Sequence, residues 1–295
     1  MRDPVIPNPW SALRRFTPAH VGLGRAGVSL PTTTQLAFQL AHARARDAVH
    51  DPLDVARVRA DLSALGLTTL SLRSAAADRA TYLQRPDLGR RLDEASQRAL
   101  DALGIPYRAD RFDVAIVVVD GLSSRAIHRH AAPYLREMLA NLPGSANTGA
   151  QELRSSREQG LTSTGAQDGR ESVHETWSVA PVAVVEQGRV AIGDAIGEAL
   201  RARLVVVLIG ERPGLTSPDS LGAYLTWEPL PGRTDAERNC LSNIRPEGLD
   251  YRDAAVRLVG LLREARRREL SGVPLKDEHD ALPRASSSPS FLLER

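Results

Sequence analysis

Two runs of consecutive apolar residues indicate the centre of the fold. Residues 204–209 read Leu-Val-Val-Val-Leu-Ile, and residues 113–119 continue Val-Ala-Ile-Val-Val-Val after an initial aspartate. Such runs are typical of strands covered on both faces, as the central strands of parallel sheets are. Each run stops at an acid beside a glycine, Asp120-Gly121 and Gly210-Glu211. Ligands of open α/β sheets bind at the carboxyl ends of strands, so Glu211 is a candidate binding residue; the simpler alternative is that it caps a loop.

From about residue 105, strand patterns alternate with helix patterns. We predict strands at 113–119, 179–185 and 204–209, and helices at 124–142, 194–200 and 251–270. The βαβαβ order, with right-handed crossovers, predicts a Rossmann-like parallel sheet. Before it, apolar residues at helical spacing predict helices at 35–50, 52–66 and 87–104. The predicted fold class is therefore α/β, with an N-terminal helical region followed by a Rossmann-like parallel-sheet domain.

The same patterns, together with shifts in composition, divide the chain into parts. Residues 1–105 form the predicted helical domain, and residues 106–277 form the predicted Rossmann-like domain. Within the latter, residues 143–178 are rich in Gly, Ser, Gln, Thr and Arg and contain almost no aliphatic run, which predicts a disordered insertion. Residues 278–295 are rich in serine and are predicted to be a flexible tail.

Composition and charge exclude several classes of protein. With 295 residues, of which 42% are hydrophobic, the chain can bury a full core, and its formal net charge of +2 indicates no nucleic-acid partner. No apolar run reaches the roughly 20 residues that span a bilayer, and the first residues contain no apolar signal region. We therefore expect no membrane partner and a cytoplasmic location. Cys240 is the only cysteine, which excludes an internal disulfide and a metal site with several cysteines.

Familiar catalytic and nucleotide-binding motifs are absent or misplaced. Residues 22–27 fit G-x-G-x-x-G, but no apolar strand precedes them and Pro31 separates them from the next helix, so we expect an irregular loop. The turn after 113–119 has no Walker Lys-Ser/Thr, and the chain contains no G-x-S-x-G. His42 and His50 share one predicted helix without a third ligand nearby, which does not indicate a metal site. The residues alone therefore predict no catalytic residue and no metal ligand.

Several blocks of unusual composition follow one another along the chain. They occupy residues 23–27 (Leu-Gly-Arg-Ala-Gly), 82–92, 120–123 (Asp-Gly-Leu-Ser), 188–190 (Gly-Arg-Val), 193–198 (Gly-Asp-Ala-Ile-Gly-Glu), 209–215 (Ile-Gly-Glu-Arg-Pro-Gly-Leu) and 238–244 (Arg-Asn-Cys-Leu-Ser-Asn-Ile). In this order and at these separations, the chain resembles the small subunit of ethanolamine ammonia-lyase. The resemblance covers about residues 16–275, with the predicted insertion as a gap.

This resemblance implies a function, a cofactor and a partner. The family's enzyme is an adenosylcobalamin-dependent lyase that converts ethanolamine to acetaldehyde and ammonia by a radical rearrangement. Its large subunit holds the substrate, its small subunit covers the cofactor, and the assembly is a hexamer of heterodimers. The cobalamin contacts of the family's small subunit map onto Val190, Glu211 and Cys240.

The three residues suit a corrin, which carries neutral amide arms around an apolar ring. Glu211 can accept hydrogen bonds from amide N–H groups, Val190 offers its backbone or an apolar side chain, and Cys240 offers a weak donor and soft contact area. Without the resemblance, Cys240 would be interpreted as a buried small hydrophobe.

The sequence also predicts how cobalt is ligated. Cobalamin enzymes that bind cobalt through a protein histidine carry D-x-H-x-x-G, whereas the only Asp-x-His here, at 277–279, continues without the glycine. We place His128 and His130 in a predicted helix, at solvated or partner-facing positions, and expect that no histidine ligates cobalt and that the cofactor stays base-on. Family members that enter bacterial microcompartments use an N-terminal extension. Only about fifteen residues stand at that position here, so a microcompartment location stays open.

Two functions of other classes remain as alternatives. The first is a non-enzymatic Rossmann-like adaptor whose Glu211 loop and basic last helix bind a protein partner without a cofactor. The second, a stand-alone enzyme acting on a nucleotide, is disfavoured by the missing phosphate fingerprints. Of these functions, only that of the lyase subunit predicts that the purified complex has the absorption spectrum of cobalamin.

Overall fold

The computed structural model describes residues 5–17, 19–105, 111–144 and 176–275. Most of the predicted insertion at 143–178, the predicted tail at 278–295 and the Asp-x-His at 277–279 lie outside these ranges. Those predictions therefore stay predictions.

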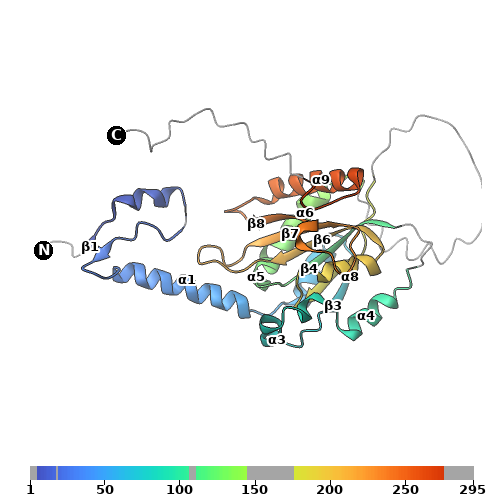
Figure 1. Cartoon of the computed structure of the whole chain (residues 1–295), viewed down its shortest axis with the longest axis horizontal. Helices are drawn as coiled ribbons and strands as arrows, with labels where there is room; N and C mark the ends of the chain where they lie inside the picture. The colour runs from blue at the N-terminus through green and yellow to red at the C-terminus, as the bar shows by residue number, and fades with distance from the viewer. Residues whose placement is uncertain (1–4, 18, 106–110, 145–175, 276–295) are drawn as a thin grey trace, which may run out of the picture.

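A six-stranded mixed sheet forms the centre of the described chain (Figure 1). Its order is β3-β5-β4-β6-β7-β8. The strands are β3 (Thr69–Arg73), β4 (Phe112–Val119), β5 (Val182–Glu186), β6 (Ala202–Gly210), β7 (Leu221–Trp227) and β8 (Arg238–Ile244). The first four strands in spatial order run parallel, whereas β7 is antiparallel to β6 and β8 is antiparallel to β7.

The three strands predicted from the sequence are present, and the α/β class is confirmed. The prediction of a wholly parallel sheet is wrong, because β7 and β8 add an antiparallel edge. Strands β3, β7 and β8 were not predicted from the sequence. β3 lies in the stretch that was interpreted as helical, β7 contains Gly222, and β8 is a polar strand at the end of the sheet. The Rossmann-like description and the domain boundaries stay predictions.

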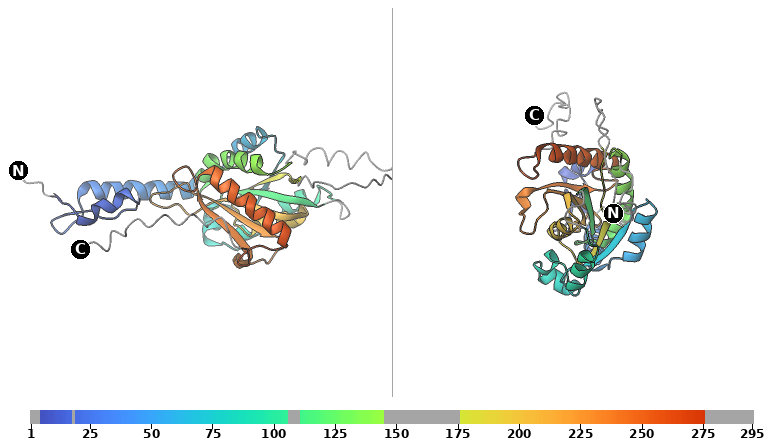
Figure 2. Two further views of the ribbon diagram at one scale, coloured as in Figure 1. Left: turned by 90° about the horizontal axis from the view of Figure 1, so that it is seen from above. Right: turned by 90° about the vertical axis from the view of Figure 1, so that its right-hand side faces the viewer.

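Helices cover both faces of the sheet, which explains the uninterrupted apolar runs (Figure 2). Alternate residues of β4 enter opposite cores: Val114, Ile116 and Val118 on one face, and Ala115, Val117 and Val119 on the other. The first core is closed by α2 (Val55–Ser63), α6 (Ala132–Asn141) and α9 (Tyr251–Arg268); the second is closed by α4 (Glu94–Asp101) and α8 (Ile192–Ala199). All six β4 side chains are fully buried, as expected for a strand between two layers.

Two predicted helices are broken in the structure. The helix predicted at 124–142 consists of α5 (Ser124–Ala126), a π-helix (η3, Ile127–Ala131) and α6. Pro133 lacks an N–H group and cannot continue the regular hydrogen-bond ladder there. The helix predicted at 87–104 is a short 3-10 turn (η2, Leu88–Arg90) followed by α4. Both predictions followed apolar spacing, which does not detect such breaks.

The N-terminal segments form an arm that extends away from the sheet (Figures 1 and 2). The arm contains β1 (Val5–Ile6), η1 (Pro9–Arg15), β2 (Arg25–Ala26) and α1 (Thr32–His50). The apolar stripe of α1 is exposed, with Leu36 at 59% and Leu40 at 52%, and only Ala48 is buried. No helix within the described ranges is both long and apolar enough to cross a membrane.

Candidate functional site

The carboxyl ends of β4 and β6 are packed backbone against backbone. The Leu122 N–H donates to the Gly210 carbonyl at 2.9 Å. A Cβ atom on Gly121, whose φ is +57°, would overlap that carbonyl oxygen, and a Cβ on Gly210 would overlap the Ser123 carbonyl. Only glycine fits at both positions, because each backbone approaches the other too closely for a Cβ atom. Asp120 and Glu211 are therefore fixed at the same edge of the sheet.

A pocket of about 390 Å³ opens at this edge. Its lining comes from α3 (Arg79–Gln84), β7 and the turns that follow β4, β5 and β6, and consists of Tyr82, Leu122, Arg189, Val190, Ile209, Gly210, Glu211, Arg212 and Tyr224. Val190 and Glu211, named from separate parts of the sequence, thus line one pocket. Cys240 lies beside it, because Cys240 is the register partner of Tyr224 and its thiol is hydrogen-bonded to the Tyr224 side chain.

The Glu211 carboxylate connects the end of β6 to the start of β7 and to β8. It accepts a short hydrogen bond from the Ser220 hydroxyl, one from Ser242 Oγ at 2.6 Å and one from the Asn243 N–H at 3.3 Å. These hydrogen bonds give Glu211 a structural role, which agrees with the alternative that this residue caps a loop. A carboxylate has about four lone-pair sites, so three donors still leave Glu211 able to accept from a ligand.

The loop that carries Val190 is held from below by Tyr82. The Tyr82 hydroxyl donates to the Gly188 carbonyl at 3.1 Å, and the guanidinium of Arg189 lies 4.2 Å from the centre of the Tyr82 ring. The Arg189 N–H also donates to the Gly89 carbonyl at 2.7 Å. The blocks at 82–92 and 188–190, which are distant in sequence, therefore meet at the pocket.

Beneath this loop lies an ion pair between a buried carboxylate and a partly exposed arginine, which the sequence did not reveal as part of the site. Asp120 is 2% exposed, and its Oδ2 is 3.5 Å from Nη1 of Arg79. Burial raises the pKa of Asp120 to about 6, although the Arg79 charge acts in the opposite direction. Asp120 was named only as an acid beside a glycine, and Arg79, Tyr82 and Arg189 were missed as neighbours of the pocket.

Cys240 is exposed, so its interpretation as a buried hydrophobe is wrong. Desolvation of the sulfur and the nearby Glu211 charge raise the pKa of this thiol, although the bond from Tyr224 acts in the opposite direction. The thiol is therefore protonated at neutral pH. A protonated thiol suits a soft contact rather than a nucleophile.

Comparisons with known proteins place these blocks in a family. A family model described as ethanolamine ammonia-lyase light chain matches residues 7–155 and 164–276. The ethanolamine ammonia-lyase small subunit of Ralstonia nicotianae is 52% identical over 290 residues, which cover 98% of this chain and 96% of that protein. Those of Pseudomonas paraeruginosa and Azotobacter vinelandii are also 52% identical, over 99% of this chain and 97% and 98% of their own lengths. The chain belongs to the ethanolamine ammonia-lyase light-chain family.

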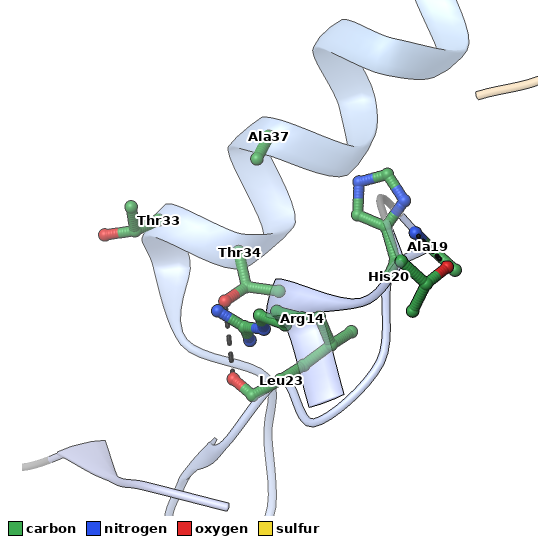
Figure 3. Close-up of a pocket in the computed structure, with 8 residues that line it drawn as sticks. Arg14, Ala19, His20, Leu23, Thr33, Thr34 and Ala37 are labelled. Atoms are coloured by element: carbon green, nitrogen blue, oxygen red, sulfur yellow. Dashed lines mark hydrogen bonds between the residues drawn. The ribbon is translucent and has the colours of Figure 1, made fainter. Parts of the chain in front are cut away.

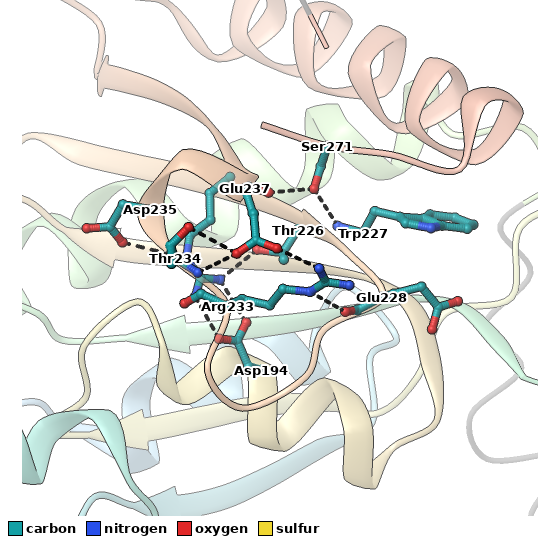
Figure 4. A network of polar contacts seen from close by, with 10 residues as sticks. Asp194, Thr226, Trp227, Glu228, Arg233, Thr234, Asp235, Glu237 and Ser271 are labelled. Carbon is teal, nitrogen blue, oxygen red and sulfur yellow. Dashed lines mark hydrogen bonds and ion pairs between the residues drawn. The ribbon is translucent and has the colours of Figure 1, made fainter. Parts of the chain in front are cut away.

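Two further family blocks meet at the start of β8 (Figure 4). Arg238 donates to both carboxylate oxygens of Asp194, at 2.7 and 2.6 Å, and both side chains are 1% exposed. The same guanidinium donates to Thr226 Oγ1 at 2.8 Å and to the Arg233 carbonyl at 3.0 Å. This network fixes β8, and with it Cys240, against α8 and β7.

A second cavity, of about 320 Å³, lies in the N-terminal arm (Figure 3). It is lined in part by Arg14, which donates to the Val21 and Gly22 carbonyls at 2.9 and 2.8 Å. Thr34 Oγ1 also reaches the Leu23 carbonyl at 3.5 Å. The G-x-G-x-x-G match packs on η1 and α1 and contains the two-residue strand β2, which pairs with β1, so the expectation of an irregular loop holds only in part. No strand leads directly into the match, as a dinucleotide site requires.

His128 and His130 both contact other groups of the same chain. His128 Nε2 accepts from the Asp54 N–H at 2.9 Å, and His130 Nδ1 lies 2.7 Å from the Tyr251 hydroxyl. His130 is buried, so the solvated or partner-facing position predicted for it is wrong; its helix turns it toward α9. Within the described ranges, no group of three or more His, Cys, Asp and Glu side chains is arranged to hold a metal ion.

Proposed function

We propose that this chain is the small subunit of an adenosylcobalamin-dependent ethanolamine ammonia-lyase, which converts ethanolamine to acetaldehyde and ammonia by a radical rearrangement. In this proposal the chain binds the cofactor, and a large subunit holds the substrate. The observation that carries it is the gathering of Val190, Glu211 and Cys240, three residues from separate sequence blocks, around one pocket. Family membership favours this function over the adaptor.

The chemistry of the pocket fits the edge of a corrin. Leu122, Val190 and Ile209 supply apolar wall, Glu211 supplies an acceptor for amide N–H groups, and the buried Nε of Arg189 is a donor without an acceptor in the described chain. Pockets for drug-sized ligands measure roughly 300–1,000 Å³, and a cobalamin is larger than such ligands. A pocket of about 390 Å³ therefore takes only part of the cofactor, and in this proposal the large subunit covers the rest.

When bound, the cofactor supplies the radical that starts the rearrangement. The residues of this chain orient its amide arms and exclude water from one edge. We propose that the cofactor is base-on, with its own base rather than a histidine on cobalt. His128 and His130 are not free to bind cobalt, because each already contacts a group of this chain, the Asp54 N–H and the Tyr251 hydroxyl. The hexamer of heterodimers is proposed on the resemblance alone, and the cytoplasmic location on the sequence pattern, which contains no apolar span or signal region.

We expect Glu211→Ala to weaken cobalamin binding by about 1–3 kcal/mol, which is roughly 5-fold to 150-fold, because hydrogen bonds to a charged group contribute about that much. The fold should survive, because Glu211 follows β6 and its Ser242 donor is exposed and can turn to water. The measurement is a titration of the complex of both subunits with adenosylcobalamin, followed by absorbance.

Ser242→Ala is the matched control for this variant. It removes one donor to Glu211 but leaves the carboxylate in place, so cofactor affinity should change less than in Glu211→Ala. An unchanged cobalamin affinity in Glu211→Ala, together with a lowered melting temperature, would show that the side chain is only structural.

A further inference from the structure

Asp120 is an ionisable group at the site to which the proposed function gives no role. Its Oδ1 accepts from the Gly188 N–H at 3.3 Å, and the N–H groups of Gln187 and Gly121 are also hydrogen-bonded to the carboxylate. These donors belong to the turn after β4 and to residues 187–190, the loop after β5 that carries Val190. The carboxylate therefore lies directly beneath the part of the chain that faces the pocket.

Arg79 connects this carboxylate to its own turn and to two other segments, the loop 187–190 and α1. Its Nη1 donates to the Gly121 carbonyl at 2.8 Å and to Gln187 Oε1 at 3.3 Å, and its Nε donates to the Val49 carbonyl at 2.6 Å. Arg79 and Arg189 both lie over the Tyr82 ring, at 4.8 and 4.2 Å from its centre. The loop 187–190 is thus held by Asp120 through its N–H groups and by Tyr82 through the Gly188 carbonyl.

We propose that the ionised carboxylate of Asp120 positions the loop 187–190 for the cofactor, so that cobalamin affinity depends on the charge of this buried side chain. The inference rests on the proposed cobalamin function. An ionised carboxylate is an acceptor only, and it matches a cluster of N–H donors and a guanidinium. A protonated carboxyl loses its charge attraction to Arg79 and accepts hydrogen bonds from the N–H groups more weakly, so the loop loses part of its support.

As pH rises, Asp120 should lower the stability of the folded chain but raise its affinity for cobalamin. Burial raises the pKa of Asp120 from 3.8 to about 6, so between these values the folded chain holds a proton that the unfolded chain releases. The contribution of Asp120 to stability therefore falls as pH rises through this window, and it is smallest once the group is ionised. Cobalamin affinity should instead rise over the same window.

Other groups that face Asp120 do not change charge in this range. Arg79 and Tyr82 reach it from α3, and Arg189 lies above Tyr82 on the loop. Arginine stays protonated, and burial raises the pKa of Tyr82 far above neutrality. From β6, Ile209 and Gly210 pack against Gly121, and neither titrates.

The experiment titrates the complex of both subunits with adenosylcobalamin between about pH 5 and pH 8, which brackets the Asp120 pKa of about 6. The wild-type complex should bind cobalamin about tenfold more weakly at the acid end of this range than at the neutral end. This is the effect expected for the loss of one charge-assisted hydrogen bond. Asp120→Asn should bind weakly throughout, with a flat profile. The flat binding profile is the result that a purely structural role for the carboxylate would not produce. The melting temperature of Asp120→Asn relative to wild type should rise from acid to neutral pH with either role, and it checks that the pKa of Asp120 is raised.

Two further variants make the test specific. Asp113→Asn is the matched control, since Asp113 is a buried acid on the same strand that pairs with Arg266 at 3.3 Å near the other end; it should keep the wild-type profile. Arg79→Gln removes the charge that lowers the Asp120 pKa, so the midpoint of binding should move to higher pH. This variant tests the inference even if Asp120→Asn does not fold.

Two results would overturn the inference while leaving the proposed function in place. One is a wild-type affinity that does not change across the window, and the other is an Asp120→Asn profile as steep as that of wild type. A wild-type complex that binds no cobalamin at any pH would instead refute the proposed function, and this inference with it.

Discussion

We expect Arg238→Met to lower the free energy of unfolding by about 3–5 kcal/mol, because removing one partner of a buried ion pair leaves the other charge without compensation. The charge left behind is the Asp194 carboxylate, which is 1% exposed and receives two hydrogen bonds from Arg238. Methionine is also a long side chain, so a lost charge pair rather than a large cavity causes the effect. Denaturant unfolding of the purified chain measures it.

Arg233→Met provides the control on the same network. Arg233 pairs with Glu237 at 2.6 Å, but both side chains are partly exposed, and such pairs contribute about 0–1 kcal/mol. A double variant, Arg238→Met with Asp194→Leu, should recover much of the loss, because apolar residues often replace a buried pair without cost. Equal losses in Arg233→Met and Arg238→Met would contradict this account of the network.

The buried centre of the fold was predictable because its residues leave few alternatives. Nine consecutive residues of β6, which runs Ala202–Gly210, include six uninterrupted aliphatic side chains, and only a strand between two helical layers buries all of them. The same argument holds for β4. The turns that follow were predictable from their glycines, because a Cβ at Gly121 or Gly210 would overlap the other turn.

The antiparallel edge was not predictable from the apolar pattern. β8 reads Arg-Asn-Cys-Leu-Ser-Asn-Ile and lies at the edge of the sheet, where most of its side chains are not buried, so it contains no apolar run. Its position depends on Arg238, whose partner Asp194 is 44 residues away in the chain. Long-range pairs of this kind have no local signal in a single sequence.

The site was predictable in part, and for two different reasons. Glu211 followed from the physical rule that strands of α/β sheets end at ligand sites. Val190 and Cys240 came only from the resemblance, since neither residue type indicates a cofactor by itself. The network of Asp120, Arg79 and Tyr82 was missed because it joins α3 to two strand ends, and only the folded chain shows that these segments meet.

We expect the isolated chain to release no ammonia from ethanolamine above background, even with adenosylcobalamin present. The pocket of about 390 Å³ contains one carboxylate, Glu211, whose oxygens already accept from Ser220, Ser242 and Asn243. The pocket is also too small to enclose both a cobalamin and a substrate.

The co-expressed complex of both subunits should be active, and the difference from the isolated chain should span the whole catalytic effect, which in enzymes is about a million-fold or more. The measurement compares ammonia release by the isolated chain, by the complex, and by the isolated chain after the separately purified large subunit is added. Recovery on addition would show that the isolated chain was folded and lacked only its partner. Ammonia release by the isolated chain at a rate comparable to the complex would instead locate the substrate site in this subunit and refute the proposed division of roles.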